Sequence, residues 1–164
     1  MKHRRRNQER GTMRALRLWT YDEAAHAIPY LRSVVSSLRE YWLDAQRHRR
    51  QWQLLAGRPG RPNREQILSG EVLQASQENA ETQFNEALEE LMAMDVYLLD
   101  PVRGIALIPF RKEDELAWYV FDQFDRQGLT GWRYHNDPLE QCRPLGAPPE
   151  APPGTASLPD GSVV

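Results

Sequence analysis

The chain has 164 residues, of which 40% are hydrophobic and 27% are charged, and its formal net charge is −2. These values are ordinary for a globular protein and create no global field that attracts nucleic acid or a membrane. No apolar run approaches the roughly 20 residues that span a bilayer, and no apolar segment follows the basic start. The single cysteine, Cys142, excludes an intramolecular disulfide and a multi-thiolate metal site. We therefore expect a cytoplasmic protein.

The two ends of the chain differ in composition from its middle. Residues 1–18 form a basic N-terminal segment that we expect to be disordered, and Met13 is an alternative start of translation. Residues 146–164 are rich in Pro, Gly and Ala, a composition that cannot bury enough apolar surface to order itself. The end of this tail is either plain disorder or a short docking peptide. Between the tails we predict one α+β domain over residues 19–145.

A long helix is predicted after Thr20. Thr20 and Glu23 have the spacing of a capping box, in which each side chain accepts a hydrogen bond from the other residue's backbone amide. Pro29 then either kinks this helix or opens a new one. Up to residue 56 apolar positions alternate by four and three, which is the spacing of a coiled-coil seam. The seam positions are Leu31, Val35, Leu38, Trp42, Ala45, Arg49, Trp52 and Ala56.

A second helix is predicted over residues 65–94, after a Gly- and Pro-rich breaker at 57–63. Two long helices joined by a short loop pack antiparallel, so residues 20–94 are expected to form a coiled-coil-like helical hairpin. Arg49 and Gln77 are polar interruptions of the two seams and are expected to set their register. The second seam consists of Leu73, Gln77, Ala80, Phe84, Ala87, Leu91 and Met94.

The segment 96–135 is expected to form a small antiparallel β-meander. Runs of β-branched and aromatic residues at 96–99, 105–109, 116–124 and 132–135 are separated by turn signals. The runs at 105–108 and 116–121 are apolar on both faces, whereas the strands of a sheet with one solvated face alternate apolar and polar residues. The helical hairpin covers one face. A second copy of the chain is expected to cover the other and to make a homo-oligomer; the alternative cover is the tail or the first short helix.

Five short segments are similar to motifs that occur in the same order in one protein family: 19–24, 28–31, 104–109, 134–135 and 143–145. With them the chain resembles a bacterial family of uncharacterised proteins, domain of unknown function 2203. The resemblance implies the fold alone, because the family has no assigned activity. Three elements of the family pattern fall on other residue types here, near Leu107, near Val120 and Phe121, and near Phe124 and Asp125. Among its polar positions only His135 and Arg143 are kept.

His135 is the strongest candidate for a chemical role. It ends an aromatic strand, with Asp137 two residues later and Asp125 expected on a neighbouring strand end. Imidazole with two carboxylates suits a divalent metal or acid–base catalysis near neutral pH. The structural alternative is a histidine that caps the sheet edge and bonds a backbone carbonyl or Asp137. No other cofactor is predicted, and no complete catalytic constellation is present.

A second candidate is a basic patch near the loop of the hairpin. Arginines bind phosphates well and Trp52 offers a stacking surface for a base, which would suit RNA. The slightly acidic chain and the seam position of Trp52 argue instead for a solvated helix end. The patch consists of Arg47, Arg49, Arg50, Arg58, Arg61 and Arg64.

These features favour a non-catalytic assembly or protein-interaction module over an enzyme. Most of the recognisable pattern lies in seam and aromatic residues, which make interfaces. A metal-binding protein or metal-dependent enzyme centred on His135, Asp125 and Asp137 is the alternative, and a weak nucleic-acid binder is third. The residues expected to carry interactions are Trp42, Trp52, Phe84, Trp118 and Trp132.

Overall fold

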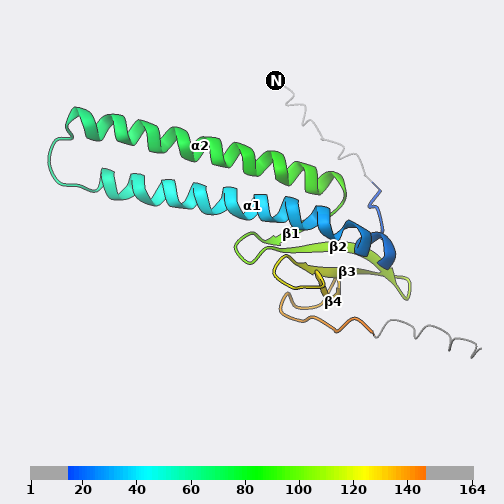
Figure 1. Cartoon of the computed structure of the whole chain (residues 1–164). Coiled ribbons are helices and arrows are strands. Elements are labelled where there is room, and N and C mark those ends of the chain that lie inside the picture. Colours follow the sequence, from blue (N-terminus) through cyan, green and yellow to red (C-terminus); the bar gives the residue numbers. More distant parts are fainter. Residues whose placement is uncertain (1–14, 147–164) are drawn as a thin grey trace, which may run out of the picture.

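A computed structural model describes residues 15–146 as two long helices followed by a four-stranded sheet (Figure 1). The predicted α+β class, with a helical hairpin and an antiparallel β-meander, is confirmed. The expectations about a start at Met13, about residues 1–14 of the N-terminal tail and about a docking peptide at the C-terminus lie outside the described residues. The elements are α1 (Tyr21–Ala56), α2 (Arg64–Ala93), β1 (Tyr97–Asp100), β2 (Ile105–Lys112), β3 (Glu115–Asp122) and β4 (Leu129–Tyr134).

The predicted capping box starts α1. The Thr20 hydroxyl accepts from the Glu23 amide at 3.2 Å, and the Thr20 amide donates to the Glu23 carboxylate at 2.8 Å. These bonds hold the pKa of Glu23 below its ordinary value. Pro29 does not open a new helix, because one helix of 36 residues, about 54 Å long, runs through it. A second capping box, Asn63 with Gln66, starts α2 one residue earlier than predicted.

The predicted seam of α2 is confirmed, since each of its positions is buried or half-buried. Near its middle the ring of Phe84 lies against that of Trp42, with centroids 5.5 Å apart. The two polar residues of the seams, Arg49 and Gln77, bind the same carboxylate, that of Glu81. Arg49 Nη2 lies 2.9 Å from Glu81 Oε1, and Gln77 Nε2 donates to the same oxygen at 2.9 Å. This bond between the helices supports the predicted role of Arg49 in fixing register.

The predicted seam positions of Trp52 and Ala56 are wrong. Beyond Ala45 the half-buried positions of α1 are Gln46, His48 and Leu55, and Trp52 and Ala56 are exposed. Leu55 instead faces α2, where a Cβ on Gly70 would lie 3.7 Å from its Cδ2. An indole needs to bury up to about 250 Å², which two helices without a third layer do not cover. This part of the hairpin extends past the sheet (Figure 1).

The sheet is a meander in the order β1-β2-β3-β4, with every neighbouring pair antiparallel. The chain between β2 and β3 turns within two residues, Glu113 and Asp114, which both have positive φ. That conformation is typical of the tight hairpin turns that match the twist of a sheet. From the sequence we expected a longer turn, at 111–115, and a third strand that ended at 124. β3 ends two residues earlier, at Asp122.

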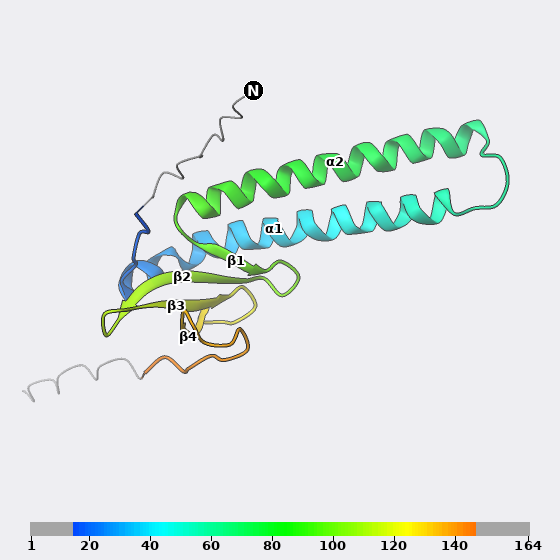
Figure 2. The ribbon, with the colours of Figure 1, turned by 180° about the vertical axis from the view of Figure 1, so that it is seen from behind.

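One face of the sheet is covered by α1 (Figure 2) and forms the main core. Consecutive side chains on β2 and β3 alternate between this face and the other, as the pleat requires. Trp19, just before α1, closes one edge: its amide donates to the Pro109 carbonyl at 2.8 Å and its indole to the Met94 carbonyl at 3.2 Å. The fully buried core residues include Leu31, Val35, Leu38, Ala106, Ile108 and Phe121.

The opposite face of the sheet is partly covered by the chain that follows β4 (Figure 2). Arg143 pairs with Trp132 through two backbone hydrogen bonds, of 2.9 and 2.7 Å, so this segment runs antiparallel to β4. The Gly131 backbone approaches it so closely that a Cβ there would lie 2.4 Å from Cys142 Sγ. The start of the C-terminal segment thus supplies part of the cover that the sequence assigned chiefly to a second copy.

Candidate functional site

His135 lies at the end of β4 and is held by β3. Its amide donates to the Leu116 carbonyl at 3.0 Å, and the Trp118 indole donates to its Nδ1 at 3.2 Å. Because Nδ1 accepts, a neutral imidazole carries its proton on Nε2. The side chain therefore extends an aromatic row with Trp118, whose ring also meets Tyr97 edge-on at 5.5 Å. This position fits the structural reading, a histidine that caps the sheet edge.

Asp137 is engaged by other partners. Its carboxylate accepts from the Tyr134 amide at 2.7 Å and binds the Arg143 guanidinium through both oxygens. The hydrogen bond from Arg143 holds the pKa of Asp137 below its ordinary value, and the same bond raises the pKa of Arg143. Arg143 also lies over the rings of Trp132 and Tyr134, at 5.1 and 4.9 Å. Asp137 thus fastens the C-terminal segment to β4.

Asp125 lies at the opposite end of the β3–β4 pair from His135. Its carboxylate accepts from the amides of Gln127 and Gly128 at 2.7 and 3.2 Å, and shapes the turn between the strands. Its carbonyl accepts from Arg32 of α1 at 2.9 Å. β3 spans 115–122 between the two ends, which is on the order of 20 Å at ~3.3 Å per residue.

The structure therefore does not bring His135, Asp137 and Asp125 together. Within residues 15–146 no group of three or more His, Cys, Asp or Glu side chains is placed to hold a metal ion. Cys142 offers no activated nucleophile either, because burial raises the pKa of its thiol. The chemistry expected from these residues has no assembled site in this part of the chain.

Two predicted interaction residues lie on opposite faces of the sheet. Trp132 is on the helix side, with Phe110 and Tyr134 edge-on at 6.1 and 5.0 Å. Trp118 is on the other side, as its cross-strand partner Arg133 is. Both indoles are half-buried. They pack within the fold, and Trp118 also faces outward.

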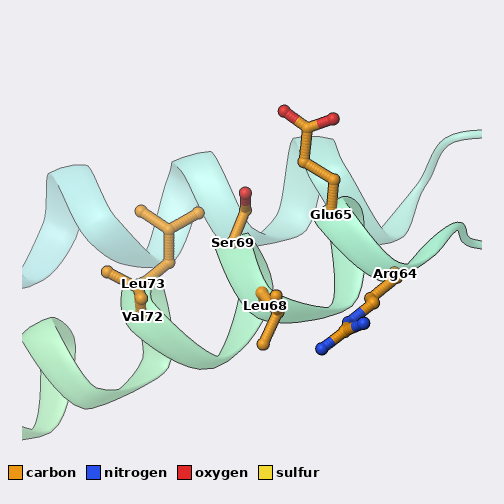
Figure 3. Close-up of a pocket in the computed structure, with 6 residues that line it drawn as sticks. All are labelled: Arg64, Glu65, Leu68, Ser69, Val72 and Leu73. Carbon is orange, nitrogen blue, oxygen red and sulfur yellow. The ribbon is translucent and has the colours of Figure 1, made fainter.

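A set of exposed apolar side chains near the hairpin loop was not anticipated from the sequence. We call it the distal surface; Figure 3 shows two of its residues, Leu68 and Val72, beside Arg64 on α2. A shallow hollow of about 680 Å³ runs along them. The four-residue spacing of Leu68 and Val72, off the seam, was the signal available. The members and their exposed fractions are Trp52 42%, Leu54 67%, Ile67 50%, Leu68 51% and Val72 64%.

Charge on the hairpin is strongly segregated. Residues 47–64 contain six arginines and no acidic residue, whereas residues 78–90 of α2 contain five glutamates and no basic residue. Arg47 pairs with Asp44 at 3.1 Å and Arg49 with Glu81, and Arg50, Arg58 and Arg61 are exposed. These three arginines of the predicted basic patch are therefore accessible, and Arg64 lines the same hollow as Leu68 and Val72.

The family of the chain is shown by a match to a family model. Residues 17–137 match the model of the family described as uncharacterized conserved protein, DUF2203. The chain is a member of that family, as its sequence motifs indicated. No curated protein and no solved structure matches it. Neither of the helices that the structure describes is long and apolar enough to cross a membrane.

The bond between Asp137 and Arg143 makes stability depend on pH. A carboxyl whose pKa is lowered by folding stabilises the folded state above its unfolded pKa of about 3.9, and this contribution is lost as pH falls through the folded value. We expect the urea midpoint of Asp137→Asn to fall less between pH 7 and pH 3 than that of the wild type. Asp44→Asn, on the exposed surface of α1, is the control and should keep the wild-type decline. Equal declines for all three proteins would contradict this role.

Proposed function

We propose that this protein is a non-catalytic assembly module of the cytoplasm, which pairs with a second copy of itself through the distal half of its hairpin. The distal surface carries this proposal. Its five large apolar side chains are at least 42% exposed and belong to the ends of α1 and α2 nearest the loop, where Leu68 and Val72 line one hollow. Exposed apolar surface of this kind commonly marks a protein interface.

The segregated charge favours a second copy as the partner. The basic segment 47–64 and the acidic segment 78–90 lie at different heights along the same hairpin. Two hairpins that pack antiparallel bring the basic segment of each copy toward the acidic segment of the other. Such complementarity orients the partners and suppresses parallel pairing, in which like charges meet.

An antiparallel overlap of two α2 helices, centred at the level of Gly70, buries the apolar side chains and brings opposite charges together. Because both helices rise by the same step per residue, Leu68 then faces the partner's Val72. Arg64 faces the partner's Ser76, and the loop that holds Arg61 lies further along, toward the partner's Glu78. The apolar side chains are thus buried at the centre, with ion pairs at either end.

The oligomeric mass tests this proposal. Light scattering on the full chain at tens of micromolar is expected to give twice the chain mass of 19.1 kDa. The variant Leu68→Glu/Val72→Glu should give the monomer mass, because it places four like charges at the centre of the overlap. Met92→Glu changes an exposed residue of the same helix outside the overlap and should stay dimeric.

A wild-type monomer under these conditions, or a double variant that stays dimeric, would contradict the proposal. Ionic strength is a second readout. The dimer should weaken between 50 mM and 500 mM NaCl, because salt screens exposed charge pairs. A dimer that does not respond to salt would mean that the basic and acidic segments do not meet.

RNA is the competing partner for the same basic segment. Four of the five residues of the distal surface are aliphatic, whereas single-stranded RNA binds chiefly by stacking its bases on aromatic rings. The apolar surface therefore favours protein over RNA. Salt-sensitive RNA binding by the wild type, retained in Leu68→Glu/Val72→Glu with its arginines intact, would assign the arginines to RNA instead.

A further inference from the structure

Arg133 is the most unusual charged residue of the sheet. It lies near the end of β4 on the face away from the helices, and only 4% of it is exposed. Nη2 donates to the Asp137 carbonyl. Nε and Nη1 are buried and have no hydrogen-bond partner among the described residues. A buried guanidinium with two donor atoms that no protein group accepts from is costly, because burial removes its hydration.

Arg133 lines a hollow of about 520 Å³ between the sheet and the chain that follows β4. Thr130 and Gln141 add polar groups to its wall, and Arg103 adds a second positive charge. The apolar part of the wall includes Leu99, Ile105, Val120 and Leu139.

The charges around the hollow also limit what it accepts. Asp100, Asp122 and Glu140 line it. One oxygen of each aspartate is used by turn amides: Asp100 accepts from Val102 and Arg103 at 2.9 Å, and Asp122 accepts from Phe124 at 2.9 Å. These carboxylates repel a group with two or more negative charges. A single negative charge can be stabilised by Arg133 without the same penalty.

We propose that this hollow binds a small organic carboxylate with an apolar body. The carboxylate accepts from the unused donors of Arg133, in the charge-assisted geometry that guanidinium groups favour. The apolar body lies against Ile105, Val120 and Leu139. Leu139 is 68% exposed, so the hollow is most weakly closed there, and the ligand enters beside it. This site is independent of the proposed dimer surface at the far end of the hairpin.

The test uses 4-methylpentanoate, its neutral isostere 4-methylpentanamide and inorganic phosphate as probes of the full chain. Calorimetry is expected to show saturable binding of the carboxylate, at least tenfold weaker binding of the amide, and no binding of phosphate. The ¹⁵N-detected side-chain signal of Arg133 Nε should shift with the carboxylate and saturate at the same concentration.

Two variants separate the site from the fold. Arg133→Gln should abolish carboxylate binding, but it changes a buried residue and is also expected to destabilise the sheet. Leu139→Asp alters an exposed residue and adds a negative charge to the wall, so it should fold normally and bind the carboxylate at least tenfold more weakly. Leu18→Asp makes the same change at an exposed site away from the hollow and should bind like the wild type. No saturable binding, equal binding of amide and carboxylate, binding of phosphate alone, or unchanged binding by Leu139→Asp would each overturn the proposal.

Discussion

Replacing Phe84 by Ala is expected to lower the free energy of unfolding by about 2–4 kcal/mol. Phe84 is half-buried, packs on the core and meets Trp42 at 5.5 Å, so truncation removes the main contact between the helices at the level where they leave the sheet. This expected loss is slightly smaller than that for a fully buried phenylalanine, because Phe84 is half-buried. Urea denaturation at one fixed protein concentration measures it, since dimerisation makes apparent stability depend on concentration.

The control is Trp52→Ala, which removes a larger ring from the exposed distal surface. It should cost less than about 1 kcal/mol, because an exposed side chain loses little packing. Combining Phe84→Ala with Trp42→Ala should reveal a coupling energy of about 0.5–1.5 kcal/mol. A Phe84→Ala cost below that of Trp52→Ala would show that the seam is placed wrongly.

Gly131→Ala is expected to be the most damaging small substitution in the sheet, at about 1–3 kcal/mol. The added Cβ would lie 2.3 Å from the Arg143 carbonyl oxygen and 2.4 Å from Cys142 Sγ. The first of these is a backbone atom, so relief requires the C-terminal segment to move away from β4. That movement weakens the Trp132–Arg143 backbone pair and the bond between Arg143 and Asp137.

Gly146→Ala is the matched control for this substitution, because a Cβ there meets no atom within 4 Å. It should leave the urea midpoint unchanged within about 0.5 kcal/mol. Amide exchange at Trp132 and Arg143 gives a local readout, and it should accelerate in Gly131→Ala alone. If Gly131→Ala unfolds like the wild type, the close approach of the two segments does not contribute to stability.

Much of the architecture could be predicted from residue spacing. The seam of α2, the capping box at Thr20 and the strand near Ile105 all rest on local patterns, which the fold keeps. Trp52 shows the limit of such patterns. Its spacing places it in the seam, but how much of an indole is covered depends on whether a third layer of structure lies beside it.

The candidate site was harder to predict because it depends on which end of a strand a residue reaches. Asp125 lies in the turn between β3 and β4, whereas His135 follows the far end of β4, so the hairpin itself separates them. Asp137 was assigned to His135 by proximity in sequence. In the structure it binds Arg143, which comes back along β4 after an irregular loop that carries no periodic signal.

The two halves of the hairpin differ in what surrounds them, and this affects how the molecule opens. Near the sheet, α1 is buried beneath residues of β2 and β3; beyond the sheet it has only α2 as a neighbour. Amides of the distal turns are therefore expected to exchange through partial unfolding of the hairpin end, and those near Leu31 and Leu38 through global unfolding. The hairpin end is thus a separate cooperative unit, which can rearrange on contact with a partner while the sheet stays folded.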